Sequence, residues 1–553
     1  MNMNRPQRQK RMLAALLATG LIGTSVAAHA DEREDLERLR ATVLSLVDTL
    51  VKHGVLPRDK VDAMMREAEV KASARLALLP APELGADGKK IVRVAYVPES
   101  VKVQMREQVR AEVLAQQGAR AAGDAAAPGK RIRVEGDLRL RGEMTRLSAD
   151  NTPASAYDSG ATLTRGPDFL TLGGSNKDLH TINTQENASR LRLRARLGVE
   201  ADLASTVTAS IGITTGATSG PTSNNQTLAQ NNYFNKSTLV LDRAAIRFAP
   251  APWLSLTGGR IRNPYAGTDL LWADDLNFEG VAVTLKPQLS PVMDTYLTAG
   301  WFPLSPSTPK QSHGRSLLGL QAGINWQFGQ KENRLKLAAA IYDFRGIEGM
   351  AETQKSYQTS TDYVVRSEYA AGYRQRGNTL FRINAPASID SNTNWGLASR
   401  FRELDLTATV DVAQFDPVHV ILTGDLVKNI GFKRDEIAQR TKESLVDGKS
   451  LGYLAKIQVG DPLANRNGAW NAYLAYRYLG SDAVVDAFTN SDFGLGGTNS
   501  KGTILGLNYG LAANTWVSAR WLSSNLIDSI VPATAVAQKF STDLIQIDLN
   551  TRF

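Results

Sequence analysis

The last nine residues of the chain, 545–553, alternate between two kinds of side chain. One set is Ile545, Ile547, Leu549, Thr551 and Phe553, and the other is Gln546, Asp548, Asn550 and Arg552. Only an extended strand converts a two-residue period into two faces, of which one is apolar and one is polar here. Such a strand, ending on an aromatic residue, suits the wall of a membrane barrel as well as a soluble sandwich. The rest of the sequence has to distinguish these two folds.

From residue 131 onward the same alternation recurs in many segments. Apolar side chains alternate with charged ones in residues 131–141 and again in residues 190–199. Residues 318–328 carry six apolar side chains on one face, with Trp326 and Phe328 together at one end, as at an interface between lipid and water. These segments predict strands with one apolar and one polar face.

The connections between these segments alternate in length. We expect short turns at residues 249–252, 329–333, 415–417 and 512–514, and long polar loops near residues 148–186, 215–236, 346–393, 431–449 and 480–500. Short turns at one rim and long loops at the other are typical of outer-membrane barrels. Strands of about 10 residues between the connections give about sixteen strands. An even number lets residues 542–553 close the sheet against the strand that begins at Arg131.

Composition narrows the fold class further. The chain has no cysteine, which excludes a disulfide scaffold and thiolate zinc sites. After residue 30, no apolar run approaches the roughly 18 residues that a spanning helix needs. We therefore predict an all-β transmembrane antiparallel barrel of about 16 strands over residues 131–553, with an α-helical periplasmic N-terminal extension. A large secreted β-sandwich is the alternative.

The amino terminus has the pattern of a secretory signal peptide over residues 1–30, with a basic start, an apolar run and a small-x-small site ending at Ala30. Its removal takes four of the 64 basic residues and none of the 55 acidic ones, so the mature charge is 60 minus 55, or +5. This balance gives little reason to expect nucleic acid as a partner. Residues 31–78 predict a helical hairpin or a short coiled coil, and residues 79–130 a linker with one helix.

Residues 251–280 contain three motifs, APWLSLTGGRIRNPY at 251–265, TDLLW at 268–272 and DLNFEG at 275–280. These motifs give a resemblance to the putative porin family of Gram-negative outer membranes. It extends to the leader, the helical segment and the strand at residues 190–196. It implies a pore-forming barrel in the lipid of the cell outer membrane, with its N-terminal extension in the periplasm. Phe553 is then the signal for the barrel assembly machinery, although Thr551 stands where such proteins often have an aromatic residue.

A barrel of about sixteen strands is too wide for its own side chains to fill, so passage depends on diameter and charge. Because guanidinium groups are always ionised, arginines on the polar faces belong in the lumen, where they favour anions. The ten expected pore-lining residues are Arg131, Arg133, Arg139, Arg141, Arg190, Arg192, Arg194, Arg196, Arg260 and Arg262. The alternative is that nearby acids pair with these arginines and the ladder only stiffens a wetted wall; these acids are Glu135, Asp137, Glu143 and Glu200.

Residues 263–275 form a candidate constriction loop that carries Asp269, Asp274 and Asp275. If this loop folds inward, its acids face the arginines across the pore, and the transverse field orients dipolar solutes. A solvated rim and a cation site are the alternatives.

The sequence shows no pattern for catalysis or for a cofactor. Its histidines lack metal-site spacing, and its serines lack a paired histidine and acid. We therefore predict a non-enzymatic porin, without cofactor or metal, for passive diffusion of small hydrophilic solutes. A receptor or adhesin with a closed barrel and binding loops is the alternative. A homo-oligomer such as a trimer is expected, and the N-terminal helices are candidates for contact with peptidoglycan.

Overall fold

The computed structural model describes most of the predicted barrel region. The described residues are 131–153, 184–216, 218, 223–229, 233–234, 236–305, 314–329, 333–350, 367–370, 372–383, 395–441, 449–528 and 539–553. The signal peptide, helical segment and linker expected in residues 1–130 lie outside the described residues and stay predictions.

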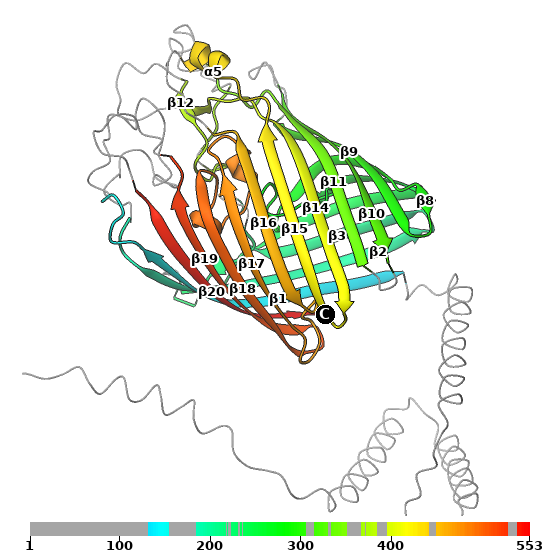
Figure 1. Ribbon diagram of the computed structural model, residues 1–553. Coiled ribbons are helices and arrows are strands. Elements are labelled where there is room, and N and C mark those ends of the chain that lie inside the picture. The colour runs from blue at the N-terminus through cyan, green and yellow to red at the C-terminus, as the bar shows by residue number, and fades with distance from the viewer. Residues whose placement is uncertain are drawn as a thin grey trace, which may run out of the picture. The chain divides into compact units, whose positions relative to one another are not determined.

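The described strands form a closed antiparallel barrel (Figure 1). Its sheet has 18 strands, of which β4 (Gln226–Thr227) and β8 (Gln288–Ser290) are short arms, so sixteen long strands make the wall. The long strands are β1 (Ile132–Leu147), β2 (Ala188–Ala204), β3 (Val207–Thr215), β5 (Leu239–Ala251), β6 (Leu254–Arg262), β7 (Asn277–Leu285), β9 (Met293–Ser305), β10 (Arg315–Phe328), β11 (Asn333–Arg345), β14 (Arg402–Phe415), β15 (Val418–Asn429), β16 (Leu451–Gly460), β17 (Trp470–Leu479), β18 (Ser500–Ala512), β19 (Thr515–Leu526) and β20 (Ser541–Arg552). This confirms the expected barrel and its strand number.

Strands β1 and β20 close the barrel. Strand β1 pairs antiparallel with both β2 and β20, so the sheet has no free edge at this seam. Beyond the end of β20, the backbone N–H of Phe553 donates to the carbonyl oxygen of Gly136 at 3.0 Å, and the N–H of Gly136 donates back at 2.9 Å. The alternating carboxy-terminal segment is therefore the closing strand, as its sequence predicts.

Side chains alternate between the outer face and the lumen. On β1, Leu138 is exposed on the outside, whereas Arg141 is buried inside the barrel. On β10, Leu320 and Trp326 face outward, whereas Gln321 is fully buried. An apolar outer face and a polar inner face are what a wall between lipid and water requires.

The two rims differ in the length of their connections. Short turns join β2 to β3, β5 to β6, β14 to β15 and β18 to β19, and this end is called the short-turn rim below. The long-loop rim carries α5 (Arg434–Thr441) and a small hairpin of β12 (Leu380–Arg382) and β13 (Trp395–Leu397) (Figure 1). No helix within the described residues has the length and apolarity needed to cross a bilayer.

Part of the lumen is filled by an apolar core. Leu270 and Trp272, from the connection between β6 and β7, pack there with wall residues such as Tyr342. Val484 and Val485, from the connection between β17 and β18, belong to the same cluster. These two connections therefore pack inside the barrel and narrow the water-filled interior that its strand number alone suggests.

Candidate functional site

Arginines of β1 and β2 face one another on the lumen side. In the antiparallel register, Arg139 lies directly opposite Arg194, and Arg141 lies directly opposite Arg192. Guanidinium groups at such positions repel one another unless carboxylates lie between them. The acid partners of these arginines therefore decide the net charge of this wall.

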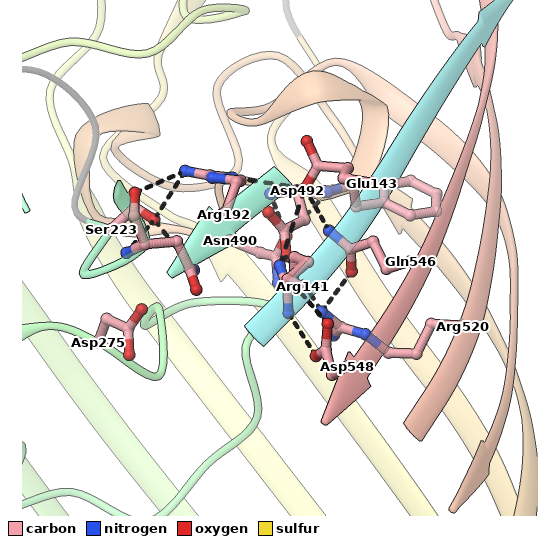
Figure 2. Close-up of polar contacts among 12 residues, drawn as sticks. Arg141, Glu143, Arg192, Ser223, Asp275, Asn490, Asp492, Arg520, Gln546 and Asp548 are labelled. Atoms are coloured by element: carbon pink, nitrogen blue, oxygen red, sulfur yellow. Dashed lines mark hydrogen bonds and ion pairs between the residues drawn. The ribbon is translucent and has the colours of Figure 1, made fainter. Parts of the chain in front are cut away.

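Arg141 is held by carboxylates from two distant segments (Figure 2). Its Nε and Nη2 donate to the two carboxylate oxygens of Asp548 at 2.8 and 2.9 Å, a bidentate pairing. Its Nη1 donates to Asp492 at 3.0 Å, and Asp492 also accepts from Arg520 at 3.2 Å. Burial alone would raise the pKa of Asp492, but the charges of Arg141 and Arg520 outweigh it and hold this pKa well below its usual range.

Glu143 neutralises the arginines nearest the long-loop rim. Arg190 donates to one of its carboxylate oxygens, and Nη1 of Arg192 donates to the other at 3.4 Å. Gln546 on β20 donates to the same oxygen at 2.9 Å. Figure 2 shows Arg192 also reaching Ser223, whose Oγ accepts at 3.4 Å. One buried carboxylate therefore serves two arginines, aided by polar groups from neighbouring segments.

Asp137 and Asp275 take the remaining arginines of β2. Nε of Arg194 donates to Asp137 at 3.0 Å, and Nε of Arg196 donates to it at 2.6 Å. Both arginines also lie near Asp275, with N···O distances of 3.3 and 3.6 Å. Asp275 thus joins the connection between β6 and β7 to the arginine wall.

The other predicted arginines also have neighbours of their own. Arg139 donates from Nε to Asn550 at 2.9 Å and lies 3.6 Å from Asp548, and Arg131 immediately precedes β1. The remaining ion pairs join Arg133 to Asp202 and Glu200, Arg260 to Glu279, and Arg262 to Glu135. All four acids that we named as alternative partners, Glu135, Asp137, Glu143 and Glu200, make such pairs. The arginine ladder is therefore extensively paired.

Residues 263–276, called the inner loop below, fold into the lumen and are anchored to strands that do not border them. The N–H of Ala266 donates to Gln321 on β10 at 2.8 Å, and Gln321 donates back to the carbonyl of Ala266 at 2.6 Å. The hydroxyl of Thr268 donates to Asp425 on β15 at 2.5 Å. These bonds hold the loop across the barrel interior.

Aromatic packing anchors the same loop. The ring of Trp272 meets Phe278 and Tyr342 edge-on, each with ring centroids 5.0 Å apart. Tyr265 meets Tyr342 in the same way at 5.0 Å. Burial of each large apolar side chain contributes about 2 kcal/mol, so these contacts stabilise the inward position strongly.

The three predicted acids of the inner loop have different surroundings. Asp269 accepts a hydrogen bond from Asn490 at 2.5 Å, and Asp275 pairs with arginines of β2. Asp274 is exposed to a cavity of the lumen, although the surrounding barrel partly desolvates its carboxylate. Burial raises the pKa of Asp274 to about 6, and the charges of Asp269 and Asp275 add to this shift.

A second inward segment, residues 480–499 between β17 and β18, was expected from the sequence to be an outer loop. Its Asp492 reaches Arg141, and its buried Phe493 lies 5.4 Å from the guanidinium of Arg477. Val484 and Val485 join the core that holds the inner loop. The sequence signal that could have predicted this inward fold is the apolar content of residues 480–499, because a fully solvated loop does not need such side chains.

A narrow passage of about 250 Å³ lies between these two segments and the barrel wall. Its lining includes four cations and four carboxylates, which are Arg139, Arg141, Arg194 and Arg520 and Asp274, Asp275, Asp492 and Asp548. A neighbouring cavity of about 510 Å³ also contains Asp274 and Asp275 and extends to Arg196 and Phe553. Two of the three predicted loop acids, Asp274 and Asp275, thus meet several predicted arginines around one opening, in which the charges balance.

The side chains around the opening are mostly polar or charged. Within the described part of the chain, no group of three or more histidine, cysteine or acidic side chains is arranged to hold a metal ion. The arginines and carboxylates of the opening mostly neutralise each other, and its lining also includes polar side chains such as Asn225, Asn490 and Ser491. Such an arrangement can orient a passing solute by its charges and dipoles.

Several solved structures are similar to this chain at low identity. The outer membrane channel DcaP of Acinetobacter baumannii is 11% identical, with 76% of this chain and 97% of that chain covered, at a TM-score of 0.37. OprB of Pseudomonas putida is 10% identical, with 77% and 95% covered, at a TM-score of 0.40. OmpF of Salmonella typhi is 11% identical, with 76% and 97% covered, at a TM-score of 0.37. No curated protein matches the chain.

A family model described as "Putative porin" matches residues 40–553. The match includes the whole described barrel and the segment 251–280 that carries the sequence resemblance. The chain therefore belongs to the putative porin family.

Proposed function

We propose that the protein is an outer-membrane porin through which small hydrophilic solutes diffuse passively. The observation that carries this proposal is the narrow passage beside the inner loop, where loop acids lie opposite wall arginines inside a closed barrel. The short-turn rim faces the periplasm in this proposal, as in other outer-membrane barrels. The family match supports the same function.

Selectivity in this proposal comes from a transverse field. Asp274 supplies negative charge from the loop and Arg139 supplies positive charge from the wall, whereas Asp275 is paired directly with Arg194. In a passage this narrow, the charges act within a Debye length, about 8 Å at physiological salt, so screening weakens them only partly. Dipolar solutes align across the passage, and the arginine ladder gives a mild preference for anions.

A closed receptor or adhesin is the second candidate. The observation that favours it is the apolar core inside the barrel, to which Leu270, Trp272 and Val484 contribute. If this core and the long loops seal the lumen completely, the barrel serves as a frame for binding loops. The two candidates differ in whether the barrel conducts ions.

Single-channel recording of the refolded mature protein in a planar bilayer, with a salt gradient, tests the porin proposal. Discrete current steps are the expected result, and the sign of the reversal potential reports which charge dominates. Folded protein that shows heat-modifiable migration on a gel but produces no steps would contradict the porin and support the closed receptor.

A further inference from the structure

A cavity of about 560 Å³ opens near the short-turn rim, along the inner side of β3, β5, β6, β7 and β9. This cavity is called the cationic vestibule below. Its lining includes six cations, which are Arg133, Arg243, Arg247, Arg260, Arg262 and Lys286. Glu200 is the one acidic residue among the described residues that line this cavity. This lining contrasts with the narrow passage, where four cations meet four carboxylates.

The carboxylates around the cationic vestibule do not balance its cations. Glu135 accepts from Arg243 at 2.6 Å and also pairs with Arg262, so one negative charge serves two positive ones. Within the described residues, Arg247 and Lys286 have no carboxylate partner, and both are exposed. Arg133 pairs with Glu200 and Asp202, and Arg260 pairs with Glu279. The six cations of the vestibule therefore share four carboxylates, whereas the narrow passage has as many carboxylates as cations.

Polar hydroxyl groups complete the lining of the cationic vestibule. Thr208 and Ser210 of β3 and Ser255 and Thr257 of β6 lie among the cations, on either side of β5. Guanidinium and ammonium groups bind carboxylates and phosphates through charge-assisted hydrogen bonds, and hydroxyl groups add further donors. The combination matches the needs of an oxyanion in a water-filled cavity.

We propose that the cationic vestibule is a binding site for small solutes that bear carboxylate or phosphate groups. The role of the site in transport rests on the porin function proposed above, whereas binding itself needs only the cavity. A concave wall of one charge sign raises the local concentration of oppositely charged solutes. The vestibule thus concentrates anionic solutes beside a passage whose own charges balance, and adds to the anion preference that the porin proposal assigns to the arginine ladder.

The test is isothermal titration calorimetry of the folded full-length protein in a non-ionic detergent at low salt. Citrate is the carboxylate probe, and inorganic pyrophosphate is the phosphate probe in a second arm. The double variant R247Q/K286Q removes the two cations without carboxylate partners and should weaken binding about tenfold, because each lost charge acts at contact distance in water. The matched control R345Q/K428Q removes two exposed cations near the long-loop rim and should leave binding unchanged.

The outcomes separate this proposal from the porin function. Tighter binding of citrate assigns carboxylate solutes to the site, and tighter binding of pyrophosphate assigns phosphorylated ones. Absence of binding by the wild-type protein, or equal affinities in the two double variants, would overturn the vestibule proposal. Binding by a protein that shows no channel currents would refute the porin function and leave the binding site standing.

Discussion

Replacement of Trp272 by alanine tests whether the inner loop sets the width of the pore. The side chain is 4% exposed, and its ring contacts Phe278 and Tyr342 edge-on. Truncation of a buried tryptophan to alanine typically costs about 3–5 kcal/mol. A loss of about 3 kcal/mol changes the ratio of docked to undocked loop by about 100-fold. The wall hydrogen bonds do not involve this side chain, so the barrel itself should still form.

Single-channel recording measures the effect of W272A directly. We expect a larger conductance, with more open-channel noise, because the loop leaves the lumen for part of the time. The matched control is W301A, which removes a tryptophan from the outer face of β9, where the side chain is 49% exposed. A conductance of W272A equal to that of wild type, in protein that shows the same heat-modifiable band, would refute the loop as the constriction.

Three further predictions concern charge and the N-terminal segment. The variant R192E/R194E should shift the reversal potential toward cations, and an unchanged potential would mean that the ladder is only structural. A fall from pH 7.5 to pH 5 should shift the potential toward anions, because Asp274, whose pKa is raised to about 6, is ionised above that pH and neutral below it; D274N should lack this step, and a step of full size in D274N would assign it to another group. Deletion of residues 31–75 should leave the conductance per barrel intact, and loss of pore formation would show that this segment is needed for assembly.

The strands and their faces could be predicted because alternation is a local property. Leu138 and Arg139 are adjacent in sequence and must point to opposite sides of any strand, so the wall and its lumen side follow from residue order. The inner loop was predictable as a candidate because its acids cluster between two strands. Its inward fold, however, depends on partners such as Gln321 and Asp425, which lie on β10 and β15.

The charge balance of the site could not be predicted in the same way. Arg141 and Asp548 are 407 residues apart, and only closure of the barrel brings them together. Asp492 reaches the same arginine because residues 480–499 fold inward. They fold inward because apolar side chains such as Val484 and Phe493 are buried in hydrophobic clusters inside the barrel. Local patterns assign a side chain to a face, but they do not identify its neighbour across the lumen.

The most direct test of whether solutes cross the barrel through the narrow passage uses the absence of cysteine in the chain. Ser491 lines the narrow passage, so S491C places the only thiol of the protein in the proposed pathway. A bulky charged methanethiosulfonate reagent, added during single-channel recording, should then reduce the current in one irreversible step per barrel. The control A322C places the thiol on the lipid-facing side of β10 and should show no step. A current in S491C that stays constant, with labelling confirmed by mass spectrometry, would contradict a pore through this passage.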